Sequence, residues 1–117
     1  MQKAEKNDSI EKVGRVFGAY MESSPYMELL WSEKLGYVLM SIRAETSEIM
    51  ESRVITDAES LCRLLIGEIV QNVLNLTGKG HDTYEADAQE HTEIKERLKP
   101  YMDQLPEYHY LCEELCL

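Results

Sequence analysis

The chain has 117 residues and a formal net charge of −10, with 44% apolar and 29% charged residues. This length fits one domain with its own core, and the apolar content is too high for a disordered chain. The negative charge disfavours direct binding to nucleic acid, membranes and acidic ligands. No apolar run approaches the roughly 18 residues of a membrane span. No signal peptide is visible, so we expect a cytoplasmic protein.

Acidic residues are concentrated in two segments of the chain. Residues 81–117 contain ten of the 22 carboxylates with three Lys or Arg, and residues 22–59 contain eight with three. The intervening residues 61–80 carry three charges, at Arg63, Glu68 and Lys79. This distribution predicts an apolar helix between two solvated segments.

The N-terminal segment predicts a helix after a disordered start. Residues 1–8 are polar, which is typical of a frayed terminus. Ser9 can cap the helix that follows, in which apolar residues recur every three or four positions at Val13, Val16, Phe17 and Tyr20. Gly14 and Gly18 lie four residues apart on this helix and indicate a notch where another backbone can approach.

A second, shorter helix is predicted from the residues that follow. Ser24 is a suitable N-cap, and Pro25 suits the first helical position because its missing N–H would have no partner there. The inward stripe of this helix would contain Met27, Leu30 and Trp31.

Residues 37–55 favour a β-hairpin. The run from Gly36 to Ile42 is rich in aromatic and branched side chains, a polar patch at 44–48 follows, and the next run ends in branched residues. The alternative is one long helix, because one helical face could contain Leu35, Val38, Leu39, Ile42, Ile49, Met50 and Val54. The hairpin gives an α+β protein, and the long helix gives an all-α bundle of four or five helices.

The segment 57–77 has the strongest helix signals in the chain. Thr56 and Glu59 can form a capping box, in which each side chain accepts from the backbone N–H of the other residue. Asp57 adds negative charge at the positive end of the helix dipole. The apolar run that follows covers most of the circumference, and Gly78 fits the left-handed position beyond the helix end. We expect the hairpin to pack on this central helix in a single, predominantly helical domain spanning residues 1–117.

The acidic C-terminal segment predicts two further helices. The first would begin at Asp82 or Thr83, and Pro100 should kink or end it. Its apolar stripe would contain Tyr84, Ala88, His91, Ile94, Leu98, Met102 and Leu105. Pro106 can start a last short helix that carries Tyr108, Leu111, Cys112 and Leu115.

The apolar positions of all these elements predict one core. We expect it to contain Val13, Phe17, Trp31, Val38, Met40, Leu61, Leu65, Ile69, Val73, Ile94, Leu98 and Leu111. Cys62, Cys112 and Cys116 fit the same core as reduced cysteines, because they are odd in number and widely separated. His109, Cys112 and Cys116 could share a helical face that binds zinc, but the sequence has no close Cys pair, so we expect no cofactor.

One carboxylate pattern resembles an enzyme family. Glu45-x-x-Glu48 is followed about twenty residues later by Glu68-x-x-Gln71, and paired acids of this kind can hold Mg²⁺. The pattern is similar to that of the all-α MazG-like nucleotide pyrophosphohydrolases. The resemblance implies a helical fold and metal binding by Glu45, Glu48 and Glu68. It covers a small part of the chain, and Gln71 stands where the family has its last acid.

The favoured functional interpretation is a small, non-enzymatic interaction or regulatory module, such as a bacterial accessory protein, that binds a partner protein with a basic surface. Aromatic rings supply contact area and carboxylates steer a basic partner. The C-terminal segment offers both, so the expected surface contains Glu85, Glu90, Glu93, Glu96, Tyr101, Tyr108 and Tyr110.

Two additions to this interpretation and one competing interpretation remain open. Spaced carboxylates can mimic nucleic acid and inhibit a protein that binds it, which predicts strong salt dependence of the interaction. The exposed edges of a two-stranded hairpin can also pair across a homodimer axis. The competing class is the MazG-like metal-dependent hydrolase.

Overall fold

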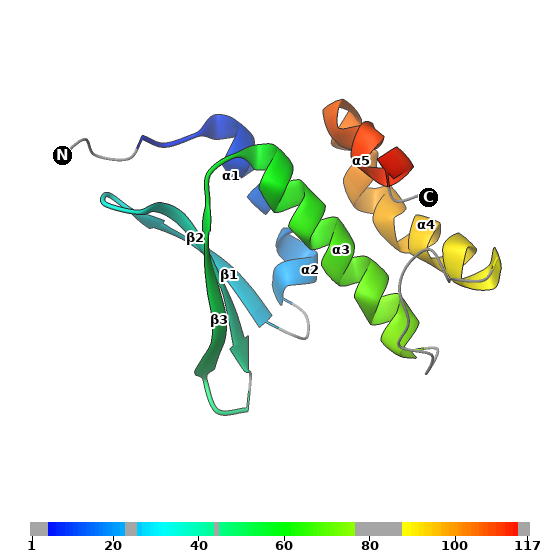
Figure 1. The fold of residues 1–117 in the computed structure, drawn as a ribbon, viewed down its shortest axis with the longest axis horizontal. Coiled ribbons are helices and arrows are strands. Elements are labelled where there is room, and N and C mark those ends of the chain that lie inside the picture. Colours follow the sequence, from blue (N-terminus) through cyan, green and yellow to red (C-terminus); the bar gives the residue numbers. More distant parts are fainter. Residues whose placement is uncertain (1–4, 23–25, 44, 77–87, 115–117) are drawn as a thin grey trace. The chain divides into compact units, whose positions relative to one another are not determined.

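The computed structural model describes residues 5–22, 26–43, 45–76 and 88–114 (Figure 1). Within these ranges it contains five α-helices, one 3₁₀ helix and a three-stranded antiparallel sheet. This composition confirms the α+β class and excludes the all-α bundle. The chain divides into two compact units, residues 1–61 and 62–117. The single domain and the packing of the hairpin on the central helix stay predictions.

The first unit begins with two consecutive helices, α1 (Asp8–Val16) and α2 (Gly18–Glu22). The N-cap of α1 is Asn7, whose side-chain oxygen accepts from the N–H of Ile10 at 3.1 Å. The prediction of Ser9 as the cap is therefore wrong by two residues. A distant contact explains the earlier start, because the N–H of Asn7 donates to the hydroxyl of Tyr37 at 2.9 Å.

Strand β1 (Tyr26–Ser32) replaces the short helix that we expected at this position. It pairs antiparallel with β2 (Gly36–Arg43), from Tyr26 opposite Ile42 to Ser32 opposite Gly36. The helical prediction is wrong because the cross-strand pairing of a full seven-residue strand overrides a weak local preference. A third strand also stabilises the hairpin, since an isolated two-stranded hairpin is marginal in water.

A tight turn joins β1 to β2 and has a clear chemical basis. The hydroxyl oxygen of Ser32 accepts from the N–H groups of Lys34 and Leu35, at 3.3 and 3.2 Å. Gly36 then has a φ of 82°, a left-handed conformation that glycine adopts without a steric penalty. These residues return the chain into β2.

The predicted hairpin is confirmed as β2 and β3 (Glu48–Ile55). The pairing runs from Tyr37 opposite Ile55 to Arg43 opposite Glu48, with an irregularity after Ser41. β2 lies between β1 and β3, so both outer strands of the described sheet are edge strands (Figure 1).

The core prediction for β2 chose the wrong face of the sheet. Tyr37 and Leu39 are buried, whereas Val38 and Met40 are half-buried. The hydrogen bond between Tyr37 and Asn7 and the contact between Gly14 and Leu29 place α1 on the face of Tyr37 and Leu39. Side chains alternate between faces, so the choice of face reverses the burial of the whole strand. Trp31 is also half-buried, whereas the other nine predicted core residues are buried, namely Val13, Phe17, Leu61, Leu65, Ile69, Val73, Ile94, Leu98 and Leu111.

The long apolar helix is α3 (Ala58–Leu76). Its N-cap side chain belongs to Asp57, which accepts from the N–H of Ser60 at 2.7 Å. The predicted capping box had Thr56 in this position and is wrong by one residue. Gly78, the predicted stop, lies outside the described residues. Nine buried side chains on α3 confirm its core character, namely Ala58, Leu61, Cys62, Leu65, Ile66, Ile69, Val70, Val73 and Leu74.

The C-terminal helices of the second unit follow the predicted order. α4 spans Ala88–Met102 and contains Pro100 in its last turn, two residues before it ends. The start that we expected at Asp82 or Thr83 lies outside the described residues. The 3₁₀ helix η2 (Pro106–Tyr108) leads into α5 (His109–Glu114), which confirms a helical start at Pro106. His109 Nε2 donates to the carbonyl of Met102 at 2.6 Å and ties the two helices together.

None of the helices in the described ranges is long and apolar enough to cross a membrane.

Two glycines give opposite predictions for stability. A Cβ at Gly67, inside α3, would have no neighbour within 4 Å, whereas a Cβ at Gly14 would lie 2.9 Å from Leu29 Cδ2. We expect Gly67→Ala to raise the free energy of unfolding by about 0.5–1 kcal/mol, because alanine is the better helix former. Gly14→Ala should lose this gain, since Leu29 has to move. Urea denaturation measures both, and equal gains would contradict the close contact.

The capping assignment is tested by a neighbouring pair of variants. Asp57→Ala should lower the free energy of unfolding by about 1 kcal/mol, because it leaves the N–H of Ser60 without its capping carboxylate. Thr56→Ala should change it by less than about half that amount. Thermal or urea denaturation compares the two. A larger loss for Thr56→Ala would restore the capping box that the sequence predicted.

Candidate functional site

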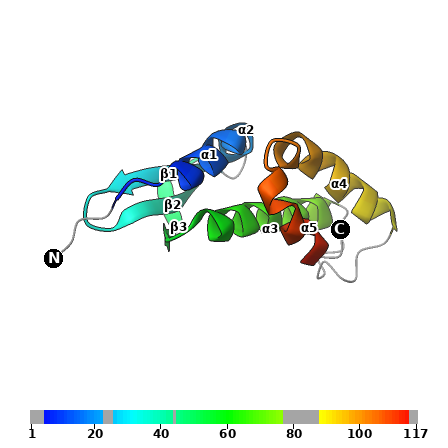
Figure 2. The same cartoon turned by 90° about the horizontal axis from the view of Figure 1, so that it is seen from above.

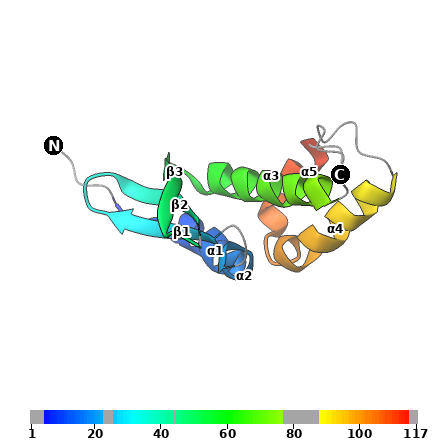
Figure 3. The same cartoon turned by 90° about the horizontal axis from the view of Figure 1, so that it is seen from below.

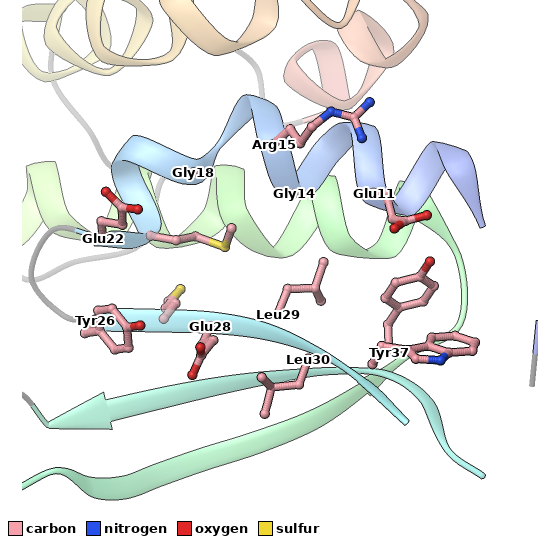
Figure 4. A pocket seen from close by; sticks show the side chains of 13 residues that line it. Glu11, Gly14, Arg15, Gly18, Glu22, Tyr26, Glu28, Leu29, Leu30 and Tyr37 are labelled. Atoms are coloured by element: carbon pink, nitrogen blue, oxygen red, sulfur yellow. The ribbon is translucent and has the colours of Figure 1, made fainter. Parts of the chain in front are cut away.

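The first unit contains a groove between its two helices and strand β1 (Figure 4). Its volume is about 510 Å³. α1 and α2 lie along the β1 side of the sheet in two further views of the molecule (Figures 2 and 3). The groove is built from residues 11–37, a part of the chain that our sequence analysis assigned to core packing.

One wall of the groove is a single face of α1 and α2. The lining residues recur at intervals of one, three or four positions, the spacing that aligns side chains along a helix. They are Glu11, Gly14, Arg15, Gly18, Met21 and Glu22. The two glycines of the predicted notch have different roles. Gly14 brings α1 against Leu29, whereas a side chain at Gly18 would extend into open space.

The opposite wall is the outer edge of β1. Six consecutive residues, Tyr26 to Trp31, line the groove. Successive side chains of a strand point to opposite faces, so a surface that touches all six follows the strand edge. Leu29 points towards the helices and Glu28 and Leu30 point away, as Figure 4 shows. In the described sheet β1 pairs with β2 on one side, and its other side faces the groove.

The charges around the groove are mainly negative. Three carboxylates line it, Glu11, Glu22 and Glu28, with one cation, Arg15, whose side chain points away from β1 (Figure 4). Glu22 and Glu28 are exposed, and Met21 and Met27 supply a buried apolar base. Carboxylates that line a groove favour a cationic ligand and disfavour an anionic one.

An aromatic cluster lies at the end of the groove near the start of α1. The rings of Trp31 and Tyr37 are 4.9 Å apart between centroids, and Lys6 Nζ lies 5.9 Å from the Trp31 ring. Burial raises the pKa of the Tyr37 phenol, and the adjacent Glu11 carboxylate adds to the shift. Tyr37 is therefore a neutral anchor that fixes the start of α1 on the sheet.

The C-terminal surface predicted from the sequence is only partly present. Glu90 is 2% exposed, so its assignment to the surface is wrong. The reason is its spacing, because Glu90 lies four residues before Ile94 and shares the buried stripe that continues to Leu98. Glu93 forms an ion pair with Arg97 at 3.1 Å, and Glu96 is exposed. Glu85 lies outside the described residues.

The tyrosines of this surface differ in exposure. Tyr101 and Tyr108 are half-buried, and Tyr110 is 40% exposed. The Tyr108 and Tyr110 rings lie 6.4 Å apart between centroids and form a tilted pair. These positions combine packing with partial exposure, so the C-terminal surface is smaller than the sequence suggested.

Two of the three carboxylates of the MazG-like pattern do not lie on helices as the resemblance requires. Glu45 is in the β2–β3 turn, Glu48 is the first residue of β3, and Glu68 lies on α3. Across the described residues, no group of three or more His, Cys, Asp or Glu could hold a metal ion. The helical basis of the resemblance is therefore wrong.

The described cysteines are protonated thiols. Cys62 is buried and Cys112 is half-buried, while Cys116 lies outside the described residues. Burial, with smaller contributions from Cys112 and Glu107, raises the pKa of Cys62 to about 12. Burial also raises the pKa of Cys112. Neither thiol is activated as a nucleophile, which requires a lowered pKa.

A second apolar surface covers the other face of the sheet. Val38 lies between Leu30 and Val54 in the pairing register, and these three side chains share that face. Leu30 is 39% and Val54 is 49% exposed, and Ile49 and Met50 at the far end of β3 are more than half exposed.

Comparisons of this chain with models of protein families, with curated proteins and with solved structures give no match. The functional argument therefore depends on the residues of the groove.

The thiol of Cys62 predicts a specific alkaline sensitivity. The folded pKa is raised from 9.0 to about 12, so its stabilising contribution is complete below pH 9 and decreases as the pH rises towards 12. The loss should be about 1.4 kcal/mol per pH unit across this range, because the unfolded thiol ionises first. Denaturation between pH 7 and 10.5 measures it, with Cys62→Ala as the control that lacks this component.

Alkylation provides an independent check on the same thiol. Iodoacetamide at pH 8 should modify the half-buried Cys112 faster than Cys62 in the folded protein, and similar rates would contradict the burial of Cys62.

Proposed function

We propose that this chain is a non-enzymatic protein–protein interaction module whose binding site is the groove between α1–α2 and the edge of β1, and that its partner is basic. The main support for this proposal is the groove itself, which has a volume of about 510 Å³ and is lined by three carboxylates and one arginine. Its volume lies in the range of ligand-binding sites, and its lining combines charged side chains with apolar ones.

The charge of the whole chain supports the same class of partner. A net charge of −10 attracts a basic protein from a distance and accelerates the encounter. The carboxylates at the groove rim then add attraction at short range. Long-range attraction is screened by salt, so the association rate should decrease as the ionic strength rises.

The groove replaces the C-terminal surface as the preferred site. The burial of Glu90 and the ion pair of Glu93 with Arg97 leave Glu96 and Tyr110 as exposed members of the predicted set. The groove combines three carboxylates with the backbone edge of β1 in one concave site. Mimicry of nucleic acid stays a prediction. It would make the basic partner a protein that binds nucleic acid.

The two surfaces can be separated by charge reversal. Affinity purification from the native host identifies the partner, which is then purified and titrated against Glu28→Lys, in the groove, and Glu96→Lys, on α4. Each variant changes the net charge of the chain equally. We expect Glu28→Lys to weaken binding about tenfold or more, because it places like charges together at the contact. Glu96→Lys should have a small effect from long-range charge alone.

Three results would decide against this proposal. Loss of binding in Glu96→Lys but not in Glu28→Lys would move the site to the C-terminal surface. If both variants lower the affinity equally and only slightly, the groove does not select its partner by charge. A purified partner whose binding is unchanged by salt would exclude electrostatic attraction as its basis.

A further inference from the structure

We infer that the groove binds an extended, basic segment of the partner protein, which adds to the edge of β1 as a fourth strand. This inference rests on the proposed function and specifies the form of the ligand. Its starting point is the edge of β1, which faces the groove along six consecutive residues, Tyr26 to Trp31.

An edge strand presents backbone N–H and C=O groups that can pair with another chain. Proteins protect such edges with charges, proline, bulges or a covering element. Here α1 and α2 pack over the face of β1 that carries Leu29, with Gly14 close to Leu29, and the groove runs along the edge beside them (Figure 4). An extended peptide in this groove would pair with β1 on one side and contact the helix face on the other, a recognised mode of peptide binding.

The length of the site limits the ligand. Six residues of a β-strand extend about 20 Å, so the segment that pairs with them has about six residues. The side chains of such a segment alternate between two faces, as those of β1 do. One set points towards the helix wall, on the same side as Leu29, and the other towards the side of Glu28 and Leu30.

The surroundings of the two faces specify the sequence pattern. On the helix side, Gly18 leaves space for an apolar side chain in the groove that Met21 also lines. On the other side, Glu28 is exposed on the edge strand, and a cross-strand Lys or Arg would pair with it favourably. Charge complementarity therefore commits the site to a segment that alternates basic and apolar residues.

A helical ligand fits these observations less well, because it would leave the edge of β1 without backbone partners. A second copy of this chain is also disfavoured as the occupant. Its charge of −10 repels another copy, and the groove rim is itself acidic. The basic, extended segment supplies partners for both the backbone groups of the β1 edge and the carboxylate of Glu28.

The probe that tests this inference is an eight-residue peptide of alternating Lys and Val. Two controls keep its length, namely a Glu–Val peptide and a Lys–Val peptide that is N-methylated at every residue. N-methylation removes the backbone N–H groups and retains the charge. Affinities are measured by calorimetry on the full chain, and amide hydrogen exchange is measured with and without the Lys–Val peptide.

We expect the Lys–Val peptide to bind and to protect amides of residues 26–32 from exchange, and the two control peptides to bind at least about tenfold more weakly. Gly18→Trp should weaken binding by a similar factor, since the indole would occupy the open space of the groove. Gly67→Trp is the matched control, because Gly67 is also open to a side chain but lies on α3. Its affinity should be unchanged.

The outcomes separate this inference from the proposed function. If the N-methylated peptide binds as well as its parent and the β1 amides gain no protection, while Glu28→Lys still weakens binding, strand addition is wrong and the acidic groove stands. If the Lys–Val peptide does not bind, the strand-addition inference is wrong, and the titration of the purified partner decides the proposed function separately. If the peptide binds equally well to Glu28→Lys, both proposals are overturned. If the chain alone dimerises in sedimentation and protects the β1 amides without peptide, the occupant is a second copy and the inference is wrong.

Discussion

The pairing of β1 with β2 is the interaction on which the rest of the first unit depends. It converts a marginal hairpin into a three-stranded sheet with a face broad enough to hold a helix. It also places Leu29 opposite Leu39 and Trp31 opposite Tyr37, on the face that receives α1. Tyr37 then fixes the start of α1 through its hydrogen bonds with the backbone of Asn7. The position of the helix is thus a consequence of the strand register.

The groove follows from the same arrangement. Gly14 lets α1 approach Leu29, and Gly18 leaves space further along the same helical face. The outer edge of β1 forms the opposite wall, so backbone groups and carboxylates line one site. A sheet with a covered edge would have no such site, and a helix without these glycines could not combine a close contact with an open space. Its use as a binding site remains our proposal.

Sequence patterns located the helices of the second unit well and its surface less well. The apolar run of α3 and the proline that starts η2 are local signals, and the structure agrees with both. Glu90 shows the limit of such signals, because a charged residue in an acidic segment was assigned to solvent although its spacing from Ile94 and Leu98 places it on the buried stripe. The helical periodicity alone predicts that Glu90 is buried. The assumption that acidic residues are exposed led to the wrong assignment. For the groove, the only advance signal was the pair of glycines four residues apart.

The sequence by itself favoured the α+β class and the hairpin, and it determined the apolar central helix and the negative charge of the chain, because composition, periodicity and turn residues act locally. Only the tertiary structure decided that residues 26–32 form a strand, which face of β2 is buried, and that a groove follows the β1 edge. These features depend on pairing between residues separated along the chain. A strand and a short helix can share one apolar pattern, and the two faces of β2 are both apolar, so the partner element makes the choice.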